Sequence, residues 1–214
     1  MTTATEKWDA KKSIPSYRAR PGRVDLITLP SQRYLAADAA GAPEAELRVP
    51  ESSLPMFSEA VQALYPLAYA LKFASKNVLG RDYVVPPLEA LWWADDMSVF
   101  TTPSNRDRWR STALLMIPAW IEEPQIESAF ETASGKVAPE LLSHVRVETL
   151  TENVAAQTLH VGPFSEEGPV VESLHAHIAD AGMELAGKHH EVYLSDVRRA
   201  APDKWRTIIR QPAR

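Results

Sequence analysis

Two short segments place a glutamate beside aromatic residues in a pattern that could support chemistry. They are LEALWW at 88–93 and HHEVYLSD at 189–196. Alternate residues of a strand share one face, so Glu191 and Tyr193 would point the same way, as Glu89 would with its aromatic neighbour. A carboxylate among rings can bind a cation, or act as a general base because apolar surroundings raise its pKa. A phenol beside it could donate a hydrogen bond to a carbonyl oxygen on which negative charge develops.

Each of these residues also has a simpler structural interpretation. Either glutamate could be a surface side chain on a half-exposed strand, and tryptophans pack in cores more often than they contact ligands. If a ligand binds here, the residues expected to contact it are Glu89, Trp92, Trp93, Trp120, Phe164 and His190.

No metal site and no common enzyme motif is expected. His175 and His177 on a helix point in different directions, as do His189 and His190 on a strand, so neither pair is suited to one ion. The chain contains no GxSxG, no GxGxxG after a strand and no GK[ST], which excludes the common hydrolase elbow and nucleotide-binding motifs. No cofactor is expected.

The composition is that of a folded domain without affinity for nucleic acid. The 214 residues carry a net charge of -5 and include no cysteine, which excludes disulfides and thiolate chemistry. No apolar stretch reaches the roughly 18 residues of a spanning helix, and the start lacks a secretory signal, so a cytoplasmic location is expected. The basic residues between Arg198 and Arg214 are expected to form a solvated helix face.

The first half of the chain alternates strand and helix patterns. Strands are predicted at 24–30 and 33–38, joined as a hairpin. Apolar residues spaced by three and four predict a helix over 51–76, which Pro66 would kink or divide. Further strands are expected at 88–93 and 111–121, followed by a helix over 122–133 with an acidic first turn.

The second half repeats this order, which predicts an α+β fold of two similar modules. Strands at 145–150 and 153–162 precede a helix through Val170, Leu174 and Ile178 and a strand at 189–196. The expected organisation is an N-terminal arm (1–22) and one domain (23–214), with module one at about 23–140 and module two at about 141–214. A pseudo-twofold axis between the modules would let Glu89 and Glu191 face one shared groove from its two sides.

Three segments together resemble the GyrI-like family: PLEALWW at 87–93, LHVGPFSEEGPVVESLH at 159–175 and KHHEVYLSDVRRAAPDKWRTIIRQP at 188–212. The last is the most specific. The resemblance covers most of residues 23–212, leaves the arm outside, and follows the subgroup that consists of this domain without a helix-turn-helix. Family members usually have a proline where this chain has Val197 and a glycine where it has Ala90.

The resemblance implies two pseudo-symmetric SHS2-type modules, each an antiparallel sheet with a packed helix, around a central ligand groove. It also implies binding of bulky aromatic or cationic small molecules. Some stand-alone members resemble hydrolases that open the cyclopropane ring of DNA-alkylating cyclopropanoid toxins, with a key glutamate and tyrosine that correspond here to Glu191 and Tyr193. No cofactor is implied.

The sequence therefore leaves three functions open. The chain could be a cyclopropanoid hydrolase, a non-catalytic multidrug-binding or effector-sensing protein, or an interaction module comparable to family members that inhibit a topoisomerase. The expected partner is a small molecule rather than nucleic acid or a membrane, and the expected state is a monomer or homodimer.

Overall fold

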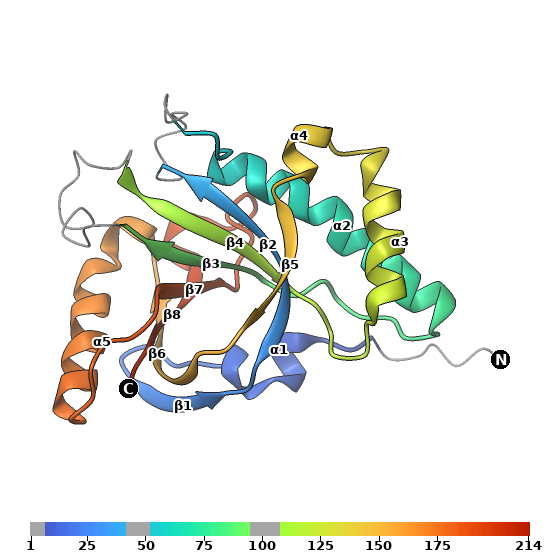
Figure 1. The fold of residues 1–214 in the computed structure, drawn as a ribbon. Coiled ribbons are helices and arrows are strands. Elements are labelled where there is room, and N and C mark those ends of the chain that lie inside the picture. Colours follow the sequence, from blue (N-terminus) through green and yellow to red (C-terminus); the bar gives the residue numbers. More distant parts are fainter. Residues whose placement is uncertain (1–6, 42–51, 95–107) are drawn as a thin grey trace.

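The computed structural model describes residues 7–41, 52–94 and 108–214, and it has the α+β architecture expected from the sequence (Figure 1). The strands are β1 (Asp25–Leu29), β2 (Gln32–Ala40), β3 (Leu88–Trp93), β4 (Arg110–Met116), β5 (Val145–Leu150), β6 (Asn153–Val161), β7 (His189–Tyr193) and β8 (Arg206–Pro212). The α-helices are α1 (Ala10–Ser13), α2 (Phe57–Val78), α3 (Glu123–Ser134), α4 (Pro139–Leu142) and α5 (Gly168–Asp180).

The eight strands form one antiparallel sheet in the order β1-β6-β8-β7-β3-β4-β2-β5. Each half of this order contains one helix-connected set of three strands, β2, β3 and β4 on one side and β6, β7 and β8 on the other. The halves meet where β3 pairs with β7, a place that we call the seam. The observed sheet therefore has the two-module organisation that the repeat predicted.

The edge strands are exchanged between the halves through two bends. β1 pairs with β6, whereas β2, which begins after only Pro30 and Ser31, pairs with β4 and β5. The prediction of a hairpin over 24–38 was therefore wrong. A two-residue hairpin needs the left-handed backbone that Gly, Asn or Asp supplies, and a Pro-Ser pair does not provide it. β5 and β6 are likewise separated by two residues and lie in opposite halves.

The longer helices α2, α3 and α5 pack on one side of the sheet, which we call the helix face. α2 and α3 cover the first half, with Leu64 and Ile126 in a core that includes Leu115 of β4. α5 covers the second half, where Leu174 and Ile178 pack with β8 (Figure 1). The apolar spacing predicted both long helices correctly, because it marks the stripe that each buries.

Helix α2 continues through Pro66 and is not divided there. A proline inside a helix leaves the carbonyl four residues earlier without its usual donor. That carbonyl belongs to Gln62, whose side chain is exposed, while Leu64 and Leu67 on either side of the proline are fully buried. Burial of the apolar stripe on both sides of Pro66 outweighs the one missing hydrogen bond.

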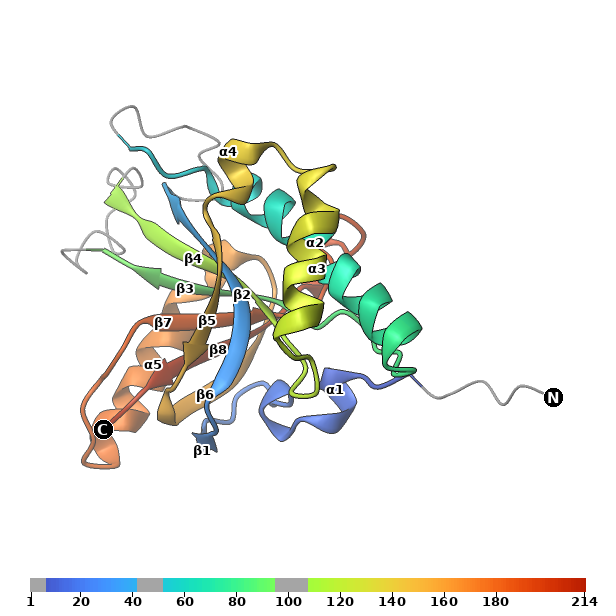
Figure 2. The same cartoon turned by 45° about the vertical axis from the view of Figure 1, so that its right-hand side comes forward.

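The N-terminal arm covers the opposite side of the sheet, which we call the arm face. In Figure 2 the arm runs beneath the sheet from the end of α2 toward β1. Trp8 forms a parallel bridge with Tyr83, and its ring meets Trp120 edge-on with centroids 5.1 Å apart. Ala10 and Tyr17 join a buried cluster with residues of β2, β3, β4, β6, β7 and β8. The arm is therefore a packed part of the domain.

The C-terminal basic segment does not form the helix face expected from its composition. Residues 206–212 are strand β8, in which Arg210 is only 3% exposed, although Arg198 and Arg199 are solvated. Arg210 is paired in the interior with the Glu152 carboxylate and bonded to the Gln157 amide oxygen, which lets its charge be buried. In the part of the chain that the structure describes, no helix combines the length and apolar character needed to cross a bilayer.

Candidate active site at the seam

The register at the seam assigns each predicted residue to a face. Glu89 lies opposite Val192, and Ala90 lies opposite Glu191. Directly opposed residues of an antiparallel pair share a face. Glu191 and Tyr193 therefore lie on the helix face with Trp92, whereas Glu89 lies on the arm face. The expectation that Glu89 and Glu191 face one groove was wrong. Glu191 lies opposite Ala90, the neighbour of Glu89, and neighbouring residues of a strand point to opposite faces.

Four side chains gather on the helix face of the seam, and we call them the seam site: Trp92, His189, Glu191 and Tyr193. The His189 Nε2 atom is 3.3 Å from Glu191 Oε1, and their side chains are 14% and 13% exposed. The indole N–H of Trp92 donates to the Tyr193 hydroxyl at 3.1 Å. The site combines a solvent-reachable carboxylate with a phenol whose oxygen already accepts a hydrogen bond.

Aromatic rings from both modules flank the seam site. On the first module, Phe57 of α2 lies 5.1 Å from Trp92 between centroids, and Trp109 lies 6.1 Å from Trp92. On the second, Phe164 lies 5.7 Å from Tyr193. Phe164 in turn packs on Trp205, with centroids 4.9 Å apart. Trp92 and Phe164 thus both contact Tyr193.

The electrostatics of the seam site keep Tyr193 protonated. Burial, and after it the charge and hydrogen bonding of Glu191, raise the pKa of the Tyr193 hydroxyl well above its ordinary value. Because that hydroxyl accepts from Trp92, its own proton is available for donation to Glu191 or to a bound molecule. The neutral phenol is thus suited to stabilise negative charge that develops on a neighbouring oxygen.

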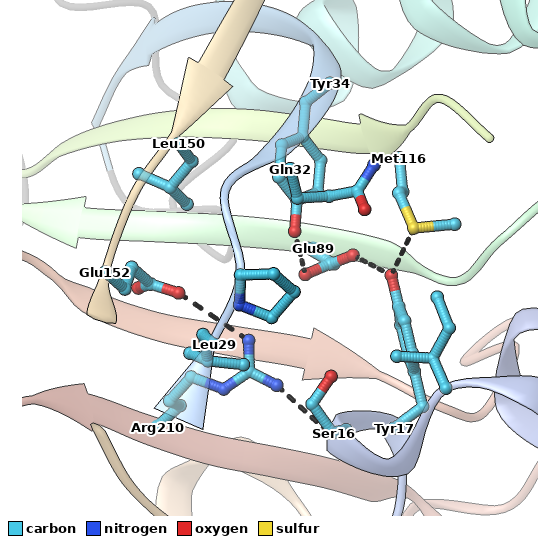
Figure 3. Close-up of a pocket in the computed structure, with 12 residues that line it drawn as sticks. Ser16, Tyr17, Leu29, Gln32, Tyr34, Glu89, Met116, Leu150, Glu152 and Arg210 are labelled. Carbon is cyan, nitrogen blue, oxygen red and sulfur yellow. Dashed lines mark hydrogen bonds and ion pairs between the residues drawn. The ribbon is translucent and has the colours of Figure 1, made fainter. Parts of the chain in front are cut away.

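A buried ionic network occupies the arm face of the seam, and Figure 3 shows its Glu89, Glu152 and Arg210. His190 is sandwiched between two carboxylates: its Nε2 is 2.9 Å from Glu89 Oε2, and its Nδ1 is 2.9 Å from Glu152 Oε1. Arg210 Nη1 lies 3.7 Å from Glu152 Oε2, and Arg210 also donates to Gln157. His190 and Glu89 are 0% and 1% exposed, so neither offers a surface to a ligand.

The network is charge-balanced when His190 is an imidazolium. A ring nitrogen facing a carboxylate acts as a donor, and both ring nitrogens of His190 face one. Burial lowers the pKa of His190, but Glu152 and Glu89 outweigh burial and raise it overall. Burial alone would raise the pKa of Glu152, but the charge of His190 and its hydrogen bond outweigh burial and lower that pKa. Two cations and two carboxylates therefore neutralise each other in the interior, as buried charges require.

The N-terminal arm seals this network. The Tyr17 hydroxyl donates to Glu89 Oε1 at 2.5 Å, and Arg210 Nη2 donates to the Ser16 carbonyl at 3.0 Å (Figure 3). Burial, followed by the charge of Glu89, raises the pKa of Tyr17 well above its ordinary value, so the phenol is a donor. A cavity of about 40 Å³ remains between the arm, Glu152 and Arg210, which is room for water molecules rather than for a drug-sized ligand.

The remaining predicted residues lie apart from the seam site. Trp93 is on the arm face, where the Lys188 ammonium lies 3.1 Å from its ring centroid. Trp120 packs against Trp8 and donates its N–H to Ser75 of α2. Of the residues expected to contact a ligand, the structure therefore groups Trp92 and Phe164 with Tyr193, and separates Glu89, His190, Trp93 and Trp120 from it.

Sequence reasoning missed two kinds of residue. His189 was considered only as a metal ligand, although its spacing of two from Glu191 already places both on one strand face. Tyr17, Glu152 and Arg210 come from an arm, a bend and the last strand, and no local pattern connects them to Glu89. Among the described residues, no three His, Asp or Glu side chains gather as a metal site would require.

Comparisons with known proteins agree with this architecture. No family model and no curated protein matches the chain. Among solved structures, an uncharacterized conserved protein from Listeria innocua is 33% identical, with a TM-score of 0.83 over 97% of this chain and 100% of its own. A hydrolase from Listeria innocua is also 33% identical, with a TM-score of 0.79 over the same shares. A match over 97% of the chain includes most of the arm, which the motifs had left outside the resemblance.

The C-terminal domain of EcmrR shares the fold at 11% identity, with a TM-score of 0.52 over 90% of this chain and 97% of its own. The full-length, one-third-identical relatives and this shared fold agree with the motifs at 87–93, 159–175 and 188–212. The chain belongs to the GyrI-like family.

Proposed function

We propose that the protein is a cofactor-independent hydrolase that opens the cyclopropane ring of cyclopropanoid DNA-alkylating compounds by adding water. The observation that carries the proposal is the seam site, where the accessible carboxylate of Glu191 lies beside the protonated phenol of Tyr193. The description of a one-third-identical relative as a hydrolase supports the reaction class. The motif resemblance supports the substrate class.

In the proposed reaction, Glu191 accepts a proton from water while the water oxygen bonds to the exposed ring carbon. The cyclopropane C–C bond breaks, and its electron pair moves into the conjugated carbonyl. The resulting oxyanion accepts a hydrogen bond from Tyr193 and is then protonated, so the net change is addition of one water molecule. Ring strain lowers the intrinsic barrier to ring opening. A general base that raises the rate about 10²–10⁴-fold, together with aromatic rings that position the substrate, is then sufficient for catalysis.

His189 gives Glu191 a defined position in this mechanism. Its Nε2 lies 3.3 Å from the carboxylate oxygen on the same strand face. Trp92 and Phe164 contact Tyr193 beside it, and aromatic rings of this kind suit a flat aromatic substrate. Bulky aromatic or cationic small molecules are therefore the proposed partners.

The test is incubation of the purified protein with a duocarmycin-type cyclopropanoid, with products followed by chromatography and mass spectrometry. Wild type is expected to form a ring-opened product with the mass of one added water. Glu191→Gln should lower turnover about 10²–10⁴-fold with little change in affinity, because it removes the base and keeps the shape. Glu131→Gln, at an exposed position of α3, is the matched control and should match wild type.

A non-catalytic binding protein is the second candidate, favoured by the aromatic rings that both modules contribute around the seam. In that case the cyclopropanoid would remain intact and would co-elute with wild type and Glu191→Gln alike. The two functions therefore separate in the same experiment.

A further inference from the structure

Strand β7 carries adjacent residues that serve opposite faces of the seam. His190 points to the arm face, and Glu191 points to the helix face. A movement of β7 along β3 would displace both residues together, because side chains alternate on a rigid strand. The contacts of His190 thus bear on the geometry of the seam site, although the two groups never touch.

His190 fixes β7 against two separate parts of the fold. Its Nε2 bonds Glu89 of β3, which belongs to the other module, and its Nδ1 bonds Glu152 in the bend between β5 and β6. All three side chains are at most 8% exposed. Arg210 of β8 supplies the second cation beside Glu152.

The helix face shows a matching bond across the same seam. Trp92 of β3 donates to Tyr193 of β7 at 3.1 Å. Strands β3 and β7 are therefore joined by a polar contact on each face, one buried and one at the proposed site.

We propose that His190 is a positioning residue for the seam site and that Tyr17 of the N-terminal arm completes its function. His190 bonds Oε2 of Glu89, and the Tyr17 hydroxyl donates to the other oxygen, Oε1, at 2.5 Å. Tyr17 therefore fixes the carboxylate that His190 binds. The arm itself is anchored at Trp8, far from the site, and Arg210 binds the Ser16 carbonyl. The effect on turnover rests on the proposed function; the effect on geometry does not.

Tyr17→Phe is the decisive variant, because it removes one hydroxyl and leaves a ring that fills the same space. Tyr83→Phe is the matched control: Tyr83 is equally buried and lies beside the arm, but it contacts neither Glu89 nor His190. Both proteins are compared with wild type by the indole N–H resonance of Trp92, assigned with Trp92→Phe, and by kcat and KM for the cyclopropanoid.

Tyr17→Phe is expected to shift the Trp92 resonance and to lower kcat about tenfold with KM unchanged, since small misplacements of catalytic groups are costly. Tyr83→Phe should change neither. In wild type at neutral pH, both ring nitrogens of His190 should carry protons. An unmoved Trp92 resonance, a neutral His190 ring, or an unchanged kcat in an active protein would overturn the proposal. If wild type has no turnover, the proposed function fails, and the resonance and the His190 ring still decide this inference.

Discussion

The two faces of the seam use similar residues in opposite environments. Each has a histidine beside a glutamate: His189 with Glu191 on the helix face and His190 with Glu89 on the arm face. The first pair is about one-seventh exposed and lies among aromatic rings, whereas the second is sealed and has further partners in Glu152 and Tyr17. Burial and the number of partners, more than residue type, thus distinguish a pair that a ligand could reach from a pair that is closed to solvent.

The largest expected difference between the faces is in stability. His190→Leu leaves Glu89 buried without its cation and Glu152 with Arg210 alone, and it should lower the free energy of unfolding by about 3–5 kcal/mol. His189→Leu breaks a partly exposed pair and should cost about 1 kcal/mol or less. Urea denaturation monitored by circular dichroism measures both. Equal losses in the two variants would contradict the distinction drawn here.

The sequence predicted the elements of this fold much better than the faces of its site. Apolar periodicity located α2, α3 and α5, because each buries one stripe, and alternation placed Glu191 and Tyr193 correctly on one face of β7. The relation between Glu89 and Glu191 depended on the register of two strands about 100 residues apart, and no local pattern sets that register. The error over 24–38 had the same origin, since β1 pairs with a distant strand rather than with its neighbour.

The burial of a charged side chain, Arg210, could not be predicted from the sequence either. Arg210 belongs to a basic segment that composition assigned to solvent, yet it is nearly inaccessible beside Glu152. Arginine is almost never buried unless paired, and its partner here lies in a bend 58 positions earlier in the chain. Only the assembled sheet brings the two together.

A second, smaller difference between the faces should appear in the pH dependence of stability. The pKa of His190 is raised in the folded protein, so its stabilising contribution is complete below the ordinary value of 6.5 and is lost as pH rises through the folded pKa. The pKa of Glu152 is lowered, so its contribution is present above 4.5 and is lost on acidification. The network should stabilise the fold most between these two values.

The measurement is the free energy of unfolding from pH 5 to pH 9, as the difference between wild type and His190→Gln. Subtraction removes the titration of groups common to both proteins, such as His175 and Lys188. Above 6.5 the difference should shrink, with a slope of at most about 1.4 kcal/mol per pH unit. A difference that is constant across this range would show that the pKa of His190 is the same in the folded and unfolded protein, and a difference that grows from pH 5 to 6.5 would show that the folded ring is neutral.

The smallest expected effect compares adjacent tryptophans on the two faces. Trp92→Phe removes the donor to Tyr193 and should weaken cyclopropanoid binding or turnover by about 1 kcal/mol. Trp93→Phe weakens the contact with Lys188 on the arm face and should cost about 0.5–1 kcal/mol of stability with no effect at the seam site. Titration of each variant with the ligand checks this; an equal loss of affinity in both would place the ligand elsewhere.

The exchange of edge strands also sets the order in which this protein can assemble as it is synthesised. β1 emerges early, but its partner residues Asn153–Gln157 are translated more than 120 residues later. At ordinary elongation rates that delay is on the order of ten seconds. Throughout it, β1 has no native partner and Arg210, over which the arm closes, has not been made, so the sheet is completed only when nearly the whole chain has left the ribosome. Non-local pairing of this kind predicts slow folding, and a window in which unpaired strands are exposed to chaperones and to other nascent chains.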